Sequence, residues 1–380
     1  MEADVPTKVN SVEVIREALR ELSYAERKEH RIQILNKNRV TLGNIVLDSA
    51  FTPEFVIEKA KALKKKQIST EEYKQLQNAL IQGEENVTAF LKVQSIIISL
   101  VRDLCSPNPV LQLSAISCCC NIALGNPKAC TILTKHIAPY LITELDCYPN
   151  YPLLEVCMWT VGNLVAESRR SFEILQAHDC LKYITSLIHN CDSTILASVI
   201  YAAVHYVHIG FKHIPENEMV ELVKTCTERI VSFENPYFIW LLALLSSHAV
   251  CNTYLYNTVP LMLDYLHQNT ANNITAVTEI TACIRILANT VSEKSGQLAK
   301  FLFSNPKYEE TNSEMLNRLL SCQHLHVRKE TLWLIGNLYN HNCSDVQKIV
   351  QDIIPKLSFI KQAVLSTTQQ TMTISTDLTI

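Results

Sequence analysis

Two short stretches decide the fold: Ser117-Cys-Cys-Cys-Asn121-Ile-Ala and Trp159-Thr-Val-Gly-Asn163-Leu-Val. Their asparagines stand 42 residues apart. The same step, with six extra residues before the last position, marks a series of anchor positions: Asn121, Asn163, His205, Ser247, Asn289 and Asn337. A repeat of about this length is typical of armadillo or HEAT helical units. The sequence therefore predicts a repeat protein.

The period also predicts how the units assemble. One unit is too small to bury its own apolar face, so neighbouring units stack into a continuous core. We expect an all-α, right-handed superhelical solenoid of about six to seven armadillo repeats, with a degenerate first unit at 57–95. The last helix of each unit should line the concave face. Turn residues mark the expected starts of these helices: Pro109, Pro152, Asp192, Pro236 and His326.

Composition excludes several other classes of protein. The 380 residues are 48% hydrophobic and include only 7 glycines, too few for the turns of an all-β or nucleotide-binding α/β domain. A net charge of −3 predicts no direct nucleic-acid partner. The 14 cysteines form no CxxC pair and are expected to be buried thiols. No apolar run is long enough for a membrane span.

The chain divides into four predicted regions. Residues 1–40 are charged and helix-prone, 41–56 form a linker, 57–364 form the repeat domain, and 365–380 form a disordered Thr/Ser/Gln-rich tail. Cys322, His324 and His326 carry metal-ligand side chains but lack a CxxC partner, so we expect no metal and no cofactor. Because no motif of a catalytic site occurs, an enzyme is not predicted.

The anchors suggest a chemistry for the concave face. Trp159 lies one helical turn before Asn163, and Trp333 lies one turn before Asn337. An asparagine can hydrogen-bond the backbone of an extended peptide, and a tryptophan ring can hold a cation. Alternatively, the tryptophans are core residues and the asparagines bridge turns. The pattern alone leaves both interpretations open.

This WxxxN pattern resembles importin-α (karyopherin-α), the adaptor family that binds nuclear localisation signals. Asn121-Ile-Ala-Leu-Gly125 is similar to one family motif, and Trp159 to Glu167 is similar to another, with Glu167 at the lysine-selecting acidic position. Cys130 falls where the family has a threonine that helps to hold that lysine. The resemblance implies a set of peptide-binding residues: Asn121, Gly125, Trp159, Asn163, Glu167, Tyr201, His205, Arg285, Asn289, Glu330, Trp333 and Asn337.

Departures from the family pattern indicate a divergent relative. Ser117 replaces one family tryptophan, and Ala243 with Ser247 replaces a whole Trp/Asn pair. Lys37-Asn38-Arg39-Val40 resembles the end of the importin-β-binding segment, but the dense basic run before it is missing. A solvated amphipathic helix is the alternative for residues 11–40. One candidate lineage for this chain is that of the transmembrane-and-coiled-coil-domain protein six, which is an armadillo group.

The resemblance implies an adaptor that holds basic, signal-bearing proteins in a concave Asn/Trp groove. It also implies importin-β as a partner through residues 11–40, and a location in cytoplasm and nucleus. The competing hypothesis is an armadillo scaffold in a protein complex, with a degenerate groove that no longer selects peptides.

Overall fold

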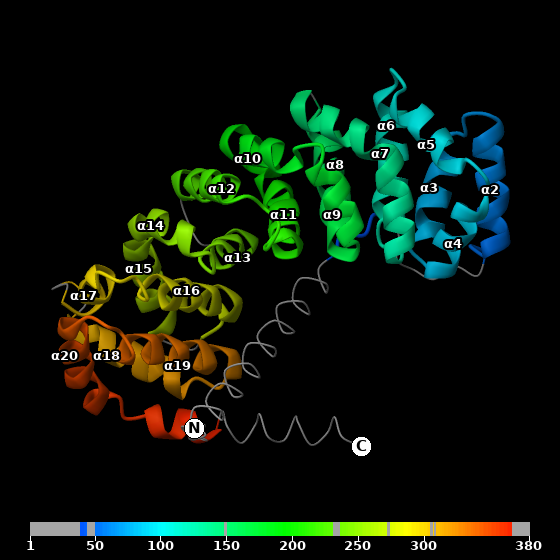
Figure 1. Ribbon diagram of the computed structural model, residues 1–380. Helices are drawn as coiled ribbons and strands as arrows, with labels where there is room; N and C mark the ends of the chain where they lie inside the picture. Colours follow the sequence, from blue (N-terminus) through cyan, green and yellow to red (C-terminus); the bar gives the residue numbers. More distant parts are fainter. Residues whose placement is uncertain are drawn as a thin grey trace, which may run out of the picture.

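The computed structural model describes residues 39–43, 50–147, 150–230, 236–271, 274–304, 307 and 309–366. Within these ranges the chain forms α-helices and short 3-10 helices, and no strand. Figure 1 shows the helices wound into an arc that runs from α2 to α20. The predicted all-α armadillo solenoid is therefore confirmed.

The helices group into units that each end in one inner helix. The first four units comprise α2 (Pro53–Lys65) and α3 (Thr70–Leu80); α4 (Glu84–Lys92), α5 (Ile96–Leu104) and α6 (Pro109–Ile122); α7 (Pro127–Cys147) and α8 (Tyr151–Glu167); and α9 (Arg169–Gln176), α10 (Cys180–Asn190) and α11 (Ser193–Gly210).

The next three units comprise α12 (Glu216–Arg229) and α13 (Pro236–Leu245); η1 (Ala249–Cys251), α14 (Asn252–Leu255), η2 (Tyr256–Thr258), α15 (Val259–Thr270) and α16 (Val277–Thr290); and α17 (Gln297–Ser304), α18 (Glu309–Ser321) and α19 (Leu325–Tyr339). An eighth unit begins with α20 (Ser344–Ile353) and η3 (Ile354–Lys356).

The last helices of successive units pack against one another in order: α3, α6, α8, α11, α13, α16 and α19. In Figure 1, α11, α13, α16 and α19 lie on the inside of the arc, while α10, α12, α14, α17 and α20 lie outside. The anchor positions therefore fall on the concave side, as the repeat predicts.

Side-chain caps explain why the inner helices begin where they do. The Oδ1 of Asn108 accepts from the backbone N of Val110 at 3.0 Å, ahead of Pro109, which starts α6. Asp192 caps α11 in the same way, accepting from the N of Thr194 at 2.9 Å. The marker His326 is the second residue of α19, because that helix begins at Leu325.

Two other boundaries differ from those expected. Helix α2 begins at Pro53, inside the predicted linker, because Thr52 caps it and proline suits the first turn. Residues 360–366 are helical, so residues 365 and 366 of the predicted tail continue a helix. Residues 1–38 and 367–380 lie outside the described residues, and with them most of the predicted N-terminal helix and tail.

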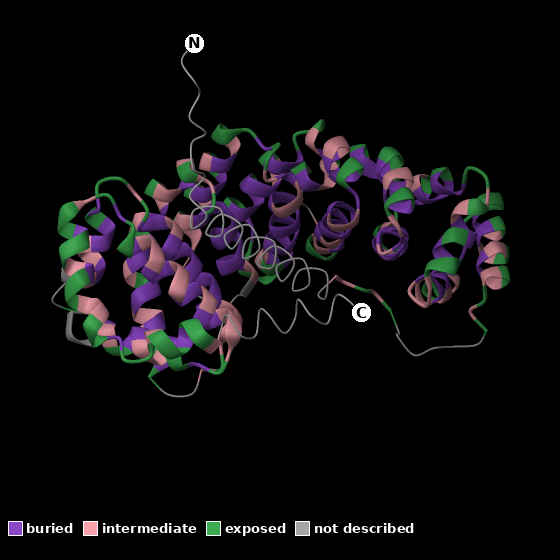
Figure 2. Ribbon diagram, turned by 60° about the horizontal axis from the view of Figure 1, so that its bottom comes forward, coloured by how far each residue is buried: buried purple, intermediate pink, exposed green. Residues whose placement is uncertain are grey.

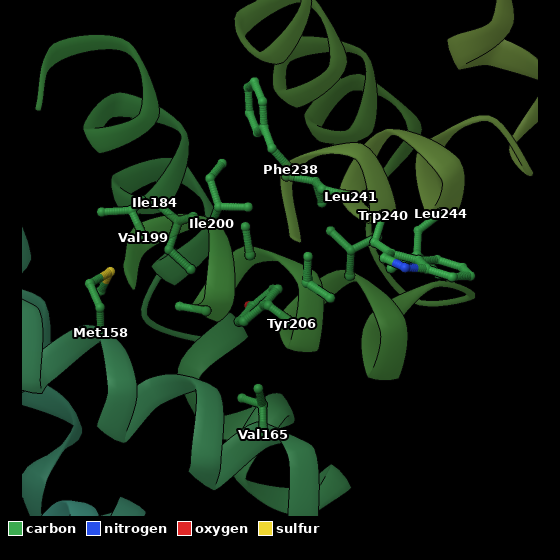
Figure 3. Close-up of a cluster of buried hydrophobic side chains, with 14 of the residues drawn as sticks. Met158, Val165, Ile184, Val199, Ile200, Tyr206, Phe238, Trp240, Leu241 and Leu244 are labelled. Carbon is green, nitrogen blue, oxygen red and sulfur yellow. The ribbon is translucent and has the colours of Figure 1, made fainter. Parts of the chain in front are cut away.

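One cluster of buried apolar residues runs through the stacked units, and Figure 2 marks the buried residues of the helices in purple. Figure 3 shows part of it, where Ile200 and Tyr206 of α11 lie near Trp240 and Leu241 of α13. Of the cysteines whose side chains are described, only Cys105 is exposed and Cys343 half-buried, which confirms the buried thiols.

One described helix, α11, is long and apolar enough to cross a membrane, which the sequence did not predict. A second candidate, α13 taken with the helical segment 249–270, qualifies only if a bend of 111° is ignored. Helix α11 is mostly buried against α8, α10 and α13, so in this fold its apolar surface forms core between units.

Candidate functional site

Amide side chains at the anchor positions link neighbouring inner helices. Each asparagine Nδ2 donates to the residue just before the anchor of the preceding unit. The links join Asn121 to the O of Gln77 at 2.9 Å, Asn163 to the O of Cys120 at 3.3 Å, Asn289 to the Oγ of Ser246 at 2.9 Å, and Asn337 to the O of Ala288 at 2.7 Å. We call this series the amide ladder.

The first link of the ladder identifies an anchor that the sequence reading missed. Gln77 precedes Asn78, which stands 43 residues before Asn121 on α3. One further backward step of 42 residues lands on Ala79, one residue past this anchor, so the strict period does not find it. The ladder also means that these asparagines link neighbouring inner helices and do not bridge turns, whatever else they bind.

Residues 39–43 of the chain itself lie against the ladder in a non-helical stretch, which we call the inner segment. Val40 meets Asn163 on α8, and Leu42 meets Asn121 on α6, so two segment residues correspond to one unit. The segment runs opposite to the order of the units. Gly43 ends it with a φ of 127° and lies against Asn78, whose Oδ1 would stand 2.4 Å from an added Cβ.

Backbone groups of alternate residues carry most of the contact with the inner segment. Asn121 accepts from the N of Leu42 at 3.0 Å and donates to its O at 2.6 Å. Asn163 donates to the O of Val40 at 2.9 Å, while the Tyr201 hydroxyl accepts from the N of Val40 at 3.3 Å. Thr41 is exposed. The groove therefore binds the main chain of the segment, and the side chain at residue 41 points away from these contacts into solvent.

One side chain of the inner segment enters a pocket. The Nη1 of Arg39 donates to Glu167 at 2.8 Å, and its Nη2 donates to the carbonyl O of Ala123 and, at 3.4 Å, to that of Asn163. The arginine side chain is 15% exposed and that of Glu167 is 31% exposed. Glu167, Ala123 and Asn163 thus form an acceptor-lined pocket between the C-terminal ends of α6 and α8, which we call the Glu167 pocket.

Cys130 borders this pocket from α7. Its Sγ lies 3.2 Å from the O of Ala123 and 3.6 Å from the O of Gly125. Burial raises the pKa of the thiol to about 12, against smaller opposing effects such as the charge of Arg39. The group is therefore a neutral, weak donor that points at a carbonyl already used by Arg39.

Tyr201 occupies a socket above α8. Its hydroxyl donates to the Oδ1 of Asn163 at 2.6 Å. A Cβ on Gly162 would lie 2.4 Å and 2.7 Å from two carbons of the Tyr201 ring, so only glycine leaves room for it. The sequence reading overlooked Gly162, although both WxxGN stretches carry glycine at this place.

His205 is 1% exposed and stacks edge-on against Tyr201, with ring centroids 4.6 Å apart. Burial, followed by the charges of His208 and Arg39, lowers the pKa of His205 to about 3. The ring is therefore neutral near pH 7. It supports Tyr201 and makes no described hydrogen bond to the inner segment through its buried Nε2.

Gly125 and Trp159, two of the predicted peptide-binding residues, take part in packing in the structure. An added Cβ on Gly125 would stand 2.9 Å from Val87, so this glycine makes room for α4. Trp159 is half-buried against the core, and within the described residues it makes no cation–π contact. Their part in holding a peptide stays a prediction.

The later half of the groove contains a buried ion pair. Arg285 on α16 donates to Glu330 on α19, and the two side chains are 7% and 3% exposed. The guanidinium also lies over the ring of Trp240 on α13, 5.1 Å from its centroid. The cation–π contact that the sequence pattern suggested for Trp159 and Trp333 is thus made by Trp240, which the sequence analysis did not consider. Trp333 is half-buried nearby, at the place one turn before Asn337.

The described residues offer no group of three His, Cys, Asp or Glu side chains that could hold a metal ion. Cys322 is buried, and its Sγ accepts from the backbone N of His324 at 3.4 Å. The Cys322 side chain therefore takes part in the turn that leads into α19.

Comparisons with known proteins support this architecture. No protein-family model matches the chain. Importin subunit alpha-9 of Arabidopsis thaliana is 23% identical over 243 residues, covering 61% of this chain and 45% of that protein. The chain therefore spans less than half the length of this relative.

Among solved structures, an engineered protein matches 76% of this chain and 69% of its own, with a TM-score of 0.61 and 16% identity. The crystal complex of SYS-1/POP-1 matches 80% of this chain and 62% of its own, with a TM-score of 0.50 and 11% identity. These structures share the armadillo-repeat solenoid fold with this chain, whose sequence is similar to that of an importin subunit alpha.

Proposed function

We propose that this divergent, importin-α-like armadillo protein binds extended basic segments of other proteins in the groove of α6, α8 and α11. One observation carries the proposal: residues 39–43 lie there as such a ligand would, with their backbone on the amide ladder and Arg39 in the Glu167 pocket. A partner segment would have to displace the inner segment to occupy the same positions.

The groove combines two kinds of recognition. Amides and a phenol hydrogen-bond main-chain groups, which every peptide offers. A carboxylate and two helix-terminal carbonyls supply negative potential at one position, which favours a cation there. Together these contacts fit an extended chain in which one basic residue stands directly before the first of two alternate residues whose backbone meets the ladder.

We further propose that the protein acts as a nuclear import adaptor, carrying basic signal-bearing proteins between cytoplasm and nucleus. Its similarity to an importin subunit alpha supports this role. Importin-β would bind through residues 11–40, most of which lie outside the described residues. A pull-down that recovers importin-β together with a basic-signal cargo would support the adaptor role, and recovery of neither would contradict it.

The alternative is an armadillo scaffold without peptide selection, and the later half of the groove favours it. There the charges of Arg285 and Glu330 neutralise each other, and Ala243 and Ser247 offer no Trp/Asn pair. A scaffold would bind a folded partner equally well after the Glu167 pocket is removed.

Peptide titration separates these functions. The probe is a fluorescein-labelled peptide with the sequence of residues 36–44, measured by anisotropy against the full chain carrying Arg39→Ala, which weakens the competing inner segment. We expect the Arg39→Ala chain to bind the peptide and the wild type to bind it more weakly. Adding Asn121→Ala and Asn163→Ala to the Arg39→Ala chain should lower the affinity at least about tenfold, because charge-free backbone hydrogen bonds each contribute about 1 kcal/mol.

Asn337→Ala is the matched control, since it removes an equivalent ladder amide far from the inner segment. If the Arg39→Ala chain does not bind the peptide at all, the peptide-binding function is wrong and the scaffold remains.

A further inference from the structure

We propose that the Glu167 pocket selects arginine over lysine at the position that Arg39 occupies. This inference rests on the proposed peptide-binding function and specifies its ligand. It differs from the lysine selection that the resemblance to importin-α implies for the same place.

The acceptors of the pocket are placed on two sides of the bound guanidinium. Glu167 receives Nη1, while the carbonyl of Ala123 receives Nη2, with that of Asn163 at 3.4 Å from the same nitrogen. A guanidinium is a rigid planar fork that presents separate N–H groups to separate acceptors. A lysine ammonium is a single nitrogen, so it cannot stand at both positions at once.

Desolvation acts in the same direction. The Arg39 side chain is only 15% exposed, so a cation loses most of its water on entering the pocket. An ammonium is a compact, strongly hydrated charge, whereas a guanidinium is weakly hydrated. The Nε of Arg39 is buried without a hydrogen bond, so the preference rests on the two terminal nitrogens.

The side chain at the α7 border of the pocket, that of Cys130, offers sulfur where a hydroxyl would offer oxygen. Cys130 stands at the border with a neutral thiol whose Sγ lies 3.2 Å from the carbonyl of Ala123. Sulfur is a weak acceptor, and here the thiol is turned toward that carbonyl as a donor. A hydroxyl at the same place could accept from an ammonium.

Two peptides test the selection. Both have the sequence of residues 36–44, and one carries lysine in place of the residue corresponding to Arg39. Each is titrated by anisotropy against the full chain with Arg39→Ala. We expect the arginine peptide to bind at least about tenfold more tightly, which is about 1.4 kcal/mol. Cys130→Ser should narrow the ratio by strengthening the lysine peptide, while Glu167→Gln should weaken both peptides.

The outcomes separate the two proposals. Equal affinities, or tighter binding of the lysine peptide, would overturn arginine selection and leave the peptide-binding function in place. Binding of neither peptide would overturn the function itself. A ratio that Glu167→Gln leaves unchanged, with both affinities unaffected, would place the arginine outside this pocket and also overturn the selection.

Discussion

Replacing Gly162 with alanine tests the socket that holds Tyr201. The added Cβ would lie 2.4 Å from Cε1 and 2.7 Å from Cδ1 of a ring that is only 3% exposed. Overpacking of this kind costs about 1–3 kcal/mol. Alanine gains about 0.5–1 kcal/mol over glycine inside a helix. We therefore expect Gly162→Ala to lower the free energy of unfolding by up to about 2 kcal/mol.

Gly336→Ala supplies the matched control. Gly336 precedes the anchor of α19 as Gly162 precedes that of α8, but beyond its own helix backbone and chain neighbours no atom of the described residues lies within 4 Å of its added Cβ. Only the gain in helix propensity applies, so this variant should be more stable than the wild type by about 0.5–1 kcal/mol.

Urea titration followed by circular dichroism compares the two variants with the wild type. Because repeat arrays can unfold in parts, amide hydrogen exchange of α8 and α11 supplies a local measurement. Exchange should quicken in these helices for Gly162→Ala alone. If Gly162→Ala stabilises the chain as much as Gly336→Ala does, Tyr201 does not occupy the socket and its bonds to Asn163 and Val40 are not those described.

Three further changes probe the rest of the inner face. His205 has a pKa of about 3 when folded against 6.5 as its ordinary value, so the unfolded chain binds the proton first. Stability should therefore fall as pH drops from about 6.5 toward 3, by up to about 1.4 kcal/mol per pH unit for this group, and thermal midpoints of His205→Phe should show a shallower fall. Glu330→Leu should lower the free energy of unfolding, measured by urea titration, by about 3–5 kcal/mol, because it leaves the buried charge of Arg285 without a partner. The double variant Glu330→Leu and Arg285→Met should be close to the wild type in stability, and equal losses in the single and double variants would argue against a coupled pair. Asn337→Ala should cost about 1 kcal/mol by the same assay, and no loss would mean that its bond to Ala288 is not formed.

The repeat was predictable from the sequence because each unit has a similar local pattern of residues. Asn121 and Asn163 occupy one helical position, and the caps Asn108 and Asp192 start inner helices where turn residues stand. Periodicity records which side of a helix is buried and where it begins. It therefore gave the order of the helices and the concave side on which the anchors lie.

Contacts between distant parts of the chain were not predictable in the same way. Arg39 meets Glu167 across 128 residues of sequence, and no periodic pattern records where a connecting segment comes to rest. Similarly, the sequence around each tryptophan does not indicate which of them contacts a cation. Trp240 does so because Arg285 lies one unit further along, directed by its bond to Glu330.

The spacing of two segment residues per unit couples ligand length to the curvature of the whole solenoid. An extended chain advances about 3.3 Å per residue, so two residues cover about 6.6 Å. Packed helices stand about 8–10 Å apart at their axes, and only side chains that converge toward the centre of the arc can match the shorter step. A ligand that engages more units has to keep this match at every one of them, so its register depends on the curvature of the arc. Short ligands therefore tolerate a range of curvatures, whereas long ones favour the single curvature that keeps them in register.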